Sequence, residues 1–234
     1  KKHVIFDDGD YESYDKLLIA TGSSPFVPPL KGLDKVKNRF TFTTLDDAKA
    51  LDGVLKEGTK VLIVGAGLIG LKCAEGISRK KVKTICVDLS YKVLSSILDD
   101  ESSEIVRKHL EDNGIEFYLK KQITELKEDA AILDDGTEIP FDVLVMAVGV
   151  KPNISLLKDI GGKTNRGILI DERCRTSIPD IYAAGDCCES MDAFGTPVVP
   201  EENTILHILS YSLSSKQNIS FLFLSSPYPL SKSS

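Results

Sequence analysis

The residues best placed to do chemistry form a glycine-rich turn, Gly65-Ala66-Gly67-Leu68-Ile69-Gly70, directly after an apolar run over residues 60–64. The run is typical of a buried strand, and apolar residues at helical spacing follow the turn. Gly65 allows a tight turn, Gly67 lets the backbone approach a pyrophosphate, and Gly70 lets helix and strand pack closely. The N–H groups that begin such a helix attract an anion. The turn therefore predicts a site for the phosphates of a dinucleotide.

The sequence has an acidic residue at the position where a dinucleotide site needs one. The next apolar run, 83–87, ends at Asp88, about 20 residues beyond the turn. A carboxylate there accepts hydrogen bonds from the ribose hydroxyls of the adenosine half and repels a 2′-phosphate, and no Arg occupies residues 89–91. Lys92 is the one nearby cation that argues the other way. The pattern favours NAD over NADP.

Two other apolar runs end in small residues. Ala20-Thr21-Gly22 closes the run that begins near Tyr14, and Gly185-Asp186 follows the run over residues 181–184. Asp186 is the N-cap of a following helix, or a second acid that faces a ligand, and the two roles are compatible.

One segment occurs twice in unbroken register. Residues 5–9 and 14–22 match residues 132–136 and 141–149, so that Gly149 corresponds to Gly22. Each copy is typical of a β-hairpin with an Asp-Gly turn, followed by a buried strand that ends in Gly. We infer a duplicated domain of which one copy is cut short, and the register places another glycine-rich turn roughly sixty residues before Lys1.

The elements that position these residues alternate between strand and helix. After the first strand and turn we expect a helix to about Arg79, a strand over 83–88, a helix over about 100–113 and a strand over 115–119. Ile105, Val106 and Leu110 are expected on the inner face of the second helix, with Gly114 as its stop. Such alternation predicts a parallel sheet and an α/β fold.

Composition excludes several classes of function. The 234 residues carry 35 acids against 29 Lys and Arg, for a net charge of −6, which argues against nucleic acid as a partner. No run of eighteen apolar residues predicts a membrane-spanning helix. The five cysteines (Cys73, Cys86, Cys174, Cys187 and Cys188) contain no C-x-x-C, so we expect no disulfide framework, no metal site and a reduced, cytoplasmic setting. A redox-active Cys187-Cys188 pair is the alternative.

The motifs together resemble the pyridine nucleotide–disulfide oxidoreductases, flavoproteins with two dinucleotide-binding domains. The resemblance covers about residues 3–190 and is nearest to the NADH oxidase, rubredoxin reductase and nitrite reductase branch. Four segments carry it in the family's order: 14–22, 65–70, 147–153 and 181–186. It implies a Rossmann-like NAD(P)-binding domain at 43–150, inserted in an incomplete FAD-binding domain at 1–42 and 151–202. A Ser-rich, atypical tail, 203–234, would follow.

The resemblance also implies roles for individual residues. Gly65 to Gly70, Asp88 and Gly149 would bind NAD(P)H, with NADH preferred, and Ala20, Thr21, Gly22, Gly185 and Asp186 would belong to the FAD site. Hydride would pass from NADH to FAD and then to a small molecule or a small redox protein, with no catalytic acid or base from the protein. The full-length protein would be a homodimer, without nucleic-acid or membrane partners.

Other readings stay open at this point. A thioredoxin-reductase-like enzyme would carry a C-x-x-C between Gly70 and Gly149, and the sequence has none there. A nucleotide-binding remnant would bind NAD without flavin or catalysis. The family's first phosphate-binding turn and its C-terminal interface domain are not in this sequence, so we expect an incomplete chain with weak FAD binding and little activity alone. The final electron acceptor is not identified by any residue.

Overall fold

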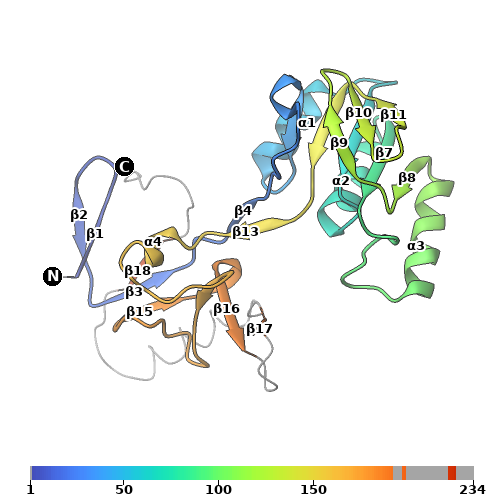
Figure 1. The fold of residues 1–234 in the computed structure, drawn as a ribbon. Helices are drawn as coiled ribbons and strands as arrows, with labels where there is room; N and C mark the ends of the chain where they lie inside the picture. The colour runs from blue at the N-terminus through green and yellow to red at the C-terminus, as the bar shows by residue number, and fades with distance from the viewer. Residues whose placement is uncertain (1, 192–196, 199–220, 225–234) are drawn as a thin grey trace. The chain divides into compact units, whose positions relative to one another are not determined.

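The computed structural model describes residues 2–191, 197–198 and 221–224, and the chain divides into two compact units. The terminal unit comprises Lys1–Ser24 and Lys151–Ser234, and the central unit comprises Pro25–Val150. Two short strands, β4 (Ser23–Pro25) and β13 (Val150–Pro152), pair with each other where the chain passes from one unit to the other (Figure 1). The expected boundary at residue 42 is therefore wrong. Residues 25–42 belong to the central unit because their strand β5 (Arg39–Thr41) pairs with its sheet.

The central unit is built on a five-stranded parallel sheet, which confirms the predicted α/β class. The strand order is β5-β12-β6-β7-β8, with β12 (Val143–Met146), β6 (Lys60–Val64), β7 (Lys83–Asp88) and β8 (Ile115–Leu119). In the register, Val64 lies opposite Met146 on one side and Val87 on the other. The carboxyl ends of β12, β6 and β7 are thus level. Gly65 and Ala147 come directly after β6 and β12, and Asp88 is the last residue of β7, so all three lie at the same edge of the sheet.

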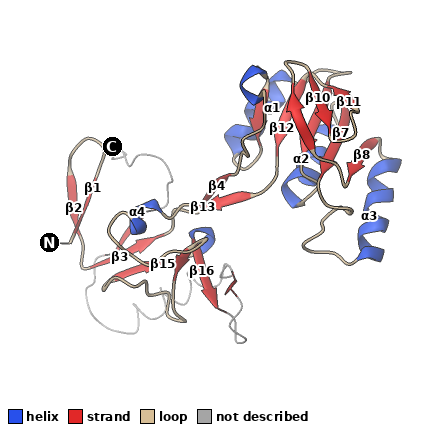
Figure 2. Cartoon of the chain, viewed as in Figure 1, coloured by secondary structure: helices blue, strands red, loops and turns tan. Residues whose placement is uncertain are grey.

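Helices cover one face of this sheet and a second sheet covers the other (Figure 2). Helices α1 (Leu45–Val54) and α2 (Leu68–Ser78) contribute Leu51, Cys73 and Ala74 to a buried cluster with the strands. On the opposite face pack the short helix η1 (Leu33–Lys35) and the antiparallel sheet β9 (Ile123–Leu126), β10 (Ala130–Leu133) and β11 (Glu138–Pro140). Burial of both faces explains why the parallel strands are almost continuously apolar.

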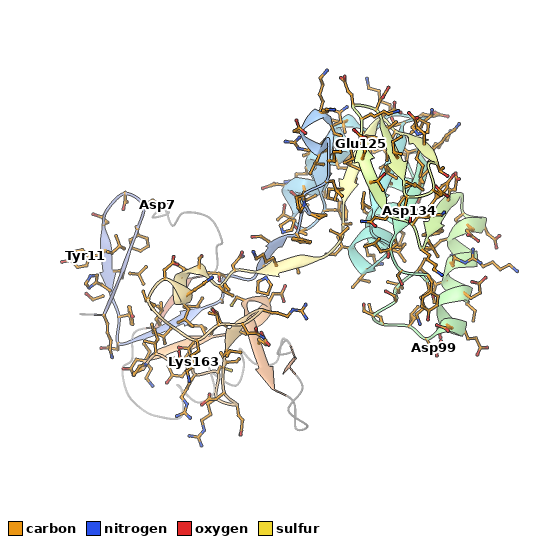
Figure 3. The ribbon with its side chains drawn as sticks, in the orientation of Figure 1. Asp7, Tyr11, Asp99, Glu125, Asp134 and Lys163 are labelled. Carbon is orange, nitrogen blue, oxygen red and sulfur yellow. The ribbon has the colours of Figure 1, made fainter. Side chains whose placement is uncertain are left out.

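Helix α3 (Asp100–Asp112) packs beside β8, and its orientation differs from the prediction. Asp99, labelled at the start of this helix in Figure 3, caps it by accepting a hydrogen bond from the Ser102 N–H at 2.8 Å. Ser103, Val106 and Leu110 face inward along one helical stripe, but Ile105 is 66% exposed. The expected inner position of Ile105 is wrong because it lies one residue, about 100° of helix rotation, away from Val106. Gly114, at φ 85°, ends the helix as predicted.

The terminal unit contains the other copy of the duplicated segment. The hairpin β1 (His3–Ile5) and β2 (Tyr11–Ser13) leads into β3 (Lys16–Ile19), as β10 and β11 lead into β12. Both hairpin turns place their glycine in the left-handed region, Gly9 at φ 86° and Gly136 at φ 84°. The predicted repeat is thus confirmed at the level of local structure.

Strand β3 is the centre of a parallel sheet with the order β15-β3-β18. The remaining elements of the unit are short: α4 (Ser155–Lys158), β14 (Ile168–Leu169), β15 (Ile181–Ala183), η2 (Gly185–Cys187), β16 (Cys188–Met191), β17 (Pro197–Val198) and β18 (Phe221–Leu224). A buried cluster that includes Leu17, Ile19, Leu157 and Ile168 joins β3, α4, β14, β15, η2 and β16.

The expected tail, 203–234, lies outside the described residues apart from β18. That strand pairs parallel with β3, from Phe221 opposite Lys16 to Leu224 opposite Ile19. In the part of the chain that the structure describes, no helix is both long and apolar enough to cross a membrane.

Candidate dinucleotide site

Gly65 makes the turn after β6 with a backbone that other residues rarely adopt. Its φ is +111°, and its N–H donates to the Val87 carbonyl at 2.8 Å. A Cβ added here would lie 2.3 Å from the Ala147 carbonyl oxygen, on the neighbouring strand end. Close approach of two strand ends therefore requires glycine at this position.

The other two glycines of the turn serve different purposes. A Cβ on Gly70 would lie 2.0 Å from the Gly65 carbonyl oxygen, so this glycine lets α2 begin tight against the turn. Gly67 has an ordinary φ of −80°, and a Cβ there would meet no described atom within 4 Å. The sequence pattern predicts that a pyrophosphate occupies this space, into which a side chain on Gly67 would project.

The N-terminus of α2 is open to an anion. Leu68 and Ile69 begin the eleven-residue helix, and among the described residues no side chain caps Gly67 and no acid occupies the first turn. The first amides of a helix lack partners within the helix, and the aligned peptide dipoles place partial positive charge there. This end of α2 faces the carboxyl edge of the sheet, where open α/β sheets bind their ligands.

Backbone N–H groups of the glycine-rich turn and of the loop after β7 hold the Asp88 carboxylate in place. Its Oδ2 accepts a hydrogen bond from the Ala66 N–H at 2.5 Å, and its Oδ1 accepts one from the Ser90 N–H at 2.7 Å. The side chain is half-buried at the end of β7. Each carboxylate oxygen has a second lone pair, so the two backbone bonds leave acceptor capacity for the hydroxyls of a ribose.

These residues line one pocket of about 620 Å³. Gly65, Gly67, Leu68, Ile69 and Asp88 form one side, and Ala147, Val148 and Gly149 extend it past β12. Gly149, at φ +115°, has no described atom within 4 Å of the place where a Cβ would lie. Of the residues expected from sequence to bind NAD(P)H, all but Ala66 and Gly70 line this one cavity. The volume lies in the range typical of small-molecule and cofactor sites.

The residues expected at a flavin lie together in the terminal unit. Ile19 and Ala183 are opposite each other on the parallel strands β3 and β15, so Ala20 and Ala184 leave the sheet side by side. The Ala184 N–H donates to the Ile19 carbonyl at 3.0 Å. Thr21, Gly22, Gly185 and Asp186 follow at this carboxyl edge, which is the ligand-binding edge of such a sheet.

The local geometry of this second edge is compatible with a flavin nucleotide. Gly22 at φ +60° and Gly185 at φ +76° each have open space where a Cβ would lie, as measured against the described atoms. Asp186 is exposed, and its Oδ2 accepts a hydrogen bond from the Ser23 hydroxyl at 3.1 Å. Its alternative role as a helix N-cap is wrong, because η2 starts after Ala184 and its cap involves no side chain of the described residues.

Asn153 is a residue whose role the sequence did not reveal. Its Nδ2 donates to the Thr21 carbonyl at 2.8 Å, while the Thr21 hydroxyl donates to the Asn153 carbonyl at 3.0 Å. The Ser24 hydroxyl adds a bond to Asn153 Oδ1 at 2.8 Å. This reciprocal pair joins the ends of the two chain segments of the terminal unit. The only sequence signal was its place at the end of the motif over residues 147–153.

The cysteines form no bridge, and all five are buried. Burial raises the pKa of Cys73 and of Cys86 to about 12, so neither is a thiolate at neutral pH. The sulfurs of Cys187 and Cys188 lie 3.7 Å apart, and the hydrogen bond between them lowers the pKa of Cys187 below its ordinary value. The central unit therefore offers no thiol nucleophile of the kind that a disulfide-reducing centre needs.

Known proteins are similar to this chain in sequence and in fold. A family model described as "Pyridine nucleotide-disulphide oxidoreductase" matches residues 1–203. An NADH oxidase of Methanocaldococcus jannaschii is 39% identical over 82% of this chain and 44% of its own length. An assimilatory nitrate reductase electron transfer subunit of Bacillus subtilis is 37% identical over 81% of this chain and 25% of its own. This chain thus spans less than half the length of either relative.

A solved structure agrees with these matches. A ferredoxin reductase from Rhodopseudomonas palustris superposes with a TM-score of 0.85 at 25% identity, over 93% of this chain and 56% of that one. The likeness supports the Rossmann-like α/β fold with a second dinucleotide-binding domain. The family match extends over both units, from the hairpin β1–β2 to beyond η2. On this combined evidence, the chain belongs to the pyridine nucleotide-disulphide oxidoreductase family.

Proposed function

We propose that this chain is the nucleotide-binding part of an FAD-dependent oxidoreductase that accepts hydride from NADH. The central unit is assigned to NADH, through the turn over residues 65–70 together with Asp88 and Gly149. The terminal unit is assigned to FAD, through Ala20, Thr21, Gly22, Gly185 and Asp186. The curated relatives are longer than this chain, and the whole protein would pass the electrons to a further acceptor.

The observation that carries this proposal is the pocket at the carboxyl edge of the central sheet. Three features converge there: an uncapped helix N-terminus for phosphate, a glycine whose missing side chain leaves room for it, and a carboxylate fixed at the next strand end. A structural turn without a ligand would not require open space at Gly67. The fixed acid favours a ribose with free hydroxyls over a 2′-phosphorylated one.

The flavin assignment is supported by the second sheet edge. Flavin supplies the electron-accepting ring, so hydride transfer requires from the protein only stacking and orientation of two nucleotides. Asp186 and the open glycine positions suit the polar ribityl–phosphate part of that cofactor. The absence of a paired acid and base among these residues is consistent with such chemistry.

We infer that the acceptor is a small molecule or a small redox protein. The relative from Bacillus subtilis is named as an electron transfer subunit, and the solved neighbour is named as a ferredoxin reductase. The first name describes electron transfer within a reductase, and the second describes a reductase that acts with a ferredoxin.

The test is FAD-dependent oxidation of NADH by the purified chain. NADH absorbance at 340 nm is followed with excess FAD and ferricyanide, with FAD alone as the background. Because this chain is expected to bind FAD weakly, the excess of FAD is needed to reveal its activity; we then expect slow oxidation above background that is lost in Gly67→Ala and in Asp186→Ala. Tight NADH binding without any FAD-dependent oxidation would favour the non-catalytic nucleotide-binding alternative.

A further inference from the structure

The loop after Asp88 contains one cation, Lys92, within residues 89–99. Leu89, Ser95 and Ser96 of this loop line the nucleotide pocket, but Lys92 does not. A lysine four residues from the ribose-binding acid could serve a 2′-phosphate, since cofactor sites that accept this group use a nearby cation. The structure shows where its ammonium is instead.

The backbone around Lys92 is fixed to the glycine-rich turn. The Leu94 N–H donates to the Ala66 carbonyl at 2.9 Å, and Leu94 adopts a left-handed φ of 49°. Val93 is fully buried, and its carbonyl accepts a hydrogen bond from the Ser103 hydroxyl at 2.7 Å. Lys92 is therefore anchored close to the pocket, and the direction of its side chain decides what it can bind.

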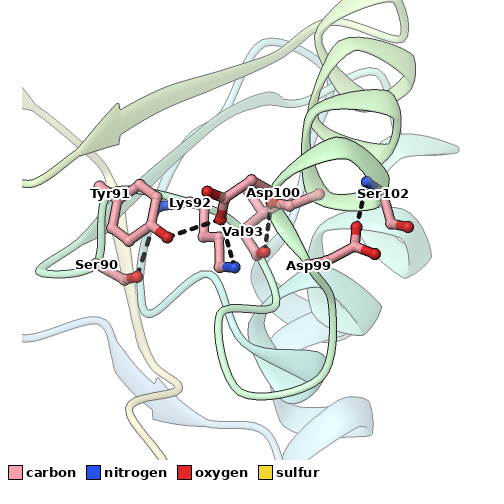
Figure 4. A network of polar contacts seen from close by, with 8 residues as sticks. Ser90, Tyr91, Lys92, Val93, Asp99, Asp100 and Ser102 are labelled. Atoms are coloured by element: carbon pink, nitrogen blue, oxygen red, sulfur yellow. Dashed lines mark hydrogen bonds and ion pairs between the residues drawn. The ribbon is translucent and has the colours of Figure 1, made fainter.

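That side chain is held by α3 (Figure 4). Lys92 Nζ lies 2.7 Å from Asp100 Oδ1, and the Tyr91 hydroxyl donates to the same oxygen at 2.7 Å. The Lys92 side chain is only 16% exposed, whereas that of Asp100 is 74% exposed. The contact raises the pKa of Lys92 and lowers the pKa of Asp100, so both groups are charged at neutral pH.

We propose that Asp100 is a specificity-determining residue that withholds Lys92 from a 2′-phosphate and so adds to the preference for NADH. The inference rests on the proposed function of the pocket. Asp88 repels the 2′-phosphate directly, and Asp100 engages the one cation of the loop over residues 89–99. Lys121, a cation that lines the pocket from another loop, is paired with Asp135. The Tyr91 hydroxyl fixes Asp100 in the position that engages Lys92.

The size of the effect follows from the exposure of the pair. An ion pair with one exposed partner, here Asp100, contributes at most about 1 kcal/mol, which is about fivefold in affinity, so releasing Lys92 is expected to improve NADPH binding by about two- to fivefold. NADH has no phosphate at this position, and its affinity is expected to change less than twofold. The signature of the arrangement is thus a change in the NADPH-to-NADH affinity ratio.

The test measures binding of NADH and NADPH to the full chain by nucleotide fluorescence. Asp100→Asn is expected to raise the affinity for NADPH about two- to fivefold, and the double variant with Lys92→Gln is expected to lose that gain. Glu101→Gln is the matched control, because it removes an exposed acid from the same first turn of α3. ADP-ribose and its 2′-phosphate, used as competitors, confine the effect to the adenosine half.

Two results would overturn the inference. One is an unchanged NADPH-to-NADH affinity ratio in Asp100→Asn, and the other is the same change of that ratio in Glu101→Gln. Lys92→Gln alone provides a second arm that does not require Asp100→Asn to fold. It is expected to leave NADPH binding unchanged, and a several-fold loss would show that Lys92 already reaches the phosphate. If the wild-type chain binds neither nucleotide, the proposed function itself fails, which is a distinct result.

Discussion

The Asp88 carboxylate and the Ala66 N–H are joined by a hydrogen bond of 2.5 Å, so the acid at the end of β7 also fixes the glycine-rich turn after β6. A bond from the Ser90 N–H to the other oxygen holds the following loop to the same side chain. Asp88 thus has a structural role and a proposed recognition role at once. Substitutions here are expected to change both stability and nucleotide choice.

Asp88→Ser is expected to narrow the preference for NADH over NADPH. The substitution removes the charge that opposes a 2′-phosphate, and each tenfold change in the preference corresponds to about 1.4 kcal/mol. It also leaves the Ala66 N–H without its partner, at a cost of about 1–3 kcal/mol in the free energy of unfolding. Fluorescence titration and urea unfolding measure the two effects separately. Equal affinities for both nucleotides in the wild-type chain would refute the assignment of Asp88.

Gly65→Ala is expected to lower the stability of the fold, whereas Gly67→Ala is expected to weaken NADH binding. Gly65→Ala places a Cβ against the Ala147 carbonyl at a positive φ, and a loss of at least about 1–3 kcal/mol in unfolding free energy is expected. Gly67→Ala meets no described atom, so stability is expected to change by less than about 1 kcal/mol. NADH affinity in Gly67→Ala is nevertheless expected to fall at least tenfold. Undiminished NADH binding in this variant would show that the phosphates lie elsewhere.

Asn153→Ala is expected to destabilise the terminal unit by about 1–3 kcal/mol. The substitution leaves the Thr21 carbonyl and the Ser24 hydroxyl without their partner at a half-buried position. Asn38→Ala, at an exposed site, serves as control and is expected to cost less than about 0.5 kcal/mol. Urea unfolding of both variants tests the difference. Equal effects would mean that Asn153 does not link the two chain segments energetically.

Glu189 is expected to make the terminal unit sensitive to acid. This side chain is 5% exposed, and the Gly167 N–H and the Asn165 amide, each 2.9 Å away, hold its pKa below the ordinary value. A lowered folded-state pKa contributes stability above the unfolded value, about 4.3, and the contribution is lost as pH falls through the folded value. Glu189→Gln is therefore expected to flatten the decline in stability below about pH 4.3. Glu172→Gln, at an exposed site, is expected to leave it unchanged.

Cys73 and Cys86 are expected to resist alkylation in the folded chain. Both are fully buried, and burial raises the pKa of each thiol to about 12. Treatment with iodoacetamide at pH 8, followed by peptide mass spectrometry, is expected to modify them only after unfolding in urea. Modification of either residue at the rate of a free thiol would place a reactive cysteine in the central unit and reopen the thiol-based reading.

The central sheet and its ligand edge could be predicted because their causes are local. Apolar runs, helical spacing and a glycine-rich turn specify β6, α2 and β7 within one continuous segment, and parallel pairing then brings Gly65 and Asp88 together. The duplicated hairpins were predictable for the same reason. Turn chemistry and a buried strand lie within twenty residues in each copy.

What the sequence could not show depends on contacts between distant segments. Because β5 pairs with β12, the first unit boundary lies at residue 24 and not at the expected residue 42. No local signal in the sequence marks that pairing. The partner of Asn153 lies more than a hundred residues away, in Thr21. Lys92 was visible as a cation near the site, but the direction of its side chain depends on Asp100 in the following helix.

The central claim, that the central unit binds NADH through the glycine-rich turn and Asp88, is tested most directly by one titration. NADH fluorescence is measured against increasing concentrations of the wild-type chain and of Gly67→Ala. We expect the wild type to bind one NADH per chain saturably, at lower concentration than NADPH requires, and the folded variant to bind NADH at least tenfold more weakly. Absence of binding by the wild type, or the same affinity in Gly67→Ala, would contradict it.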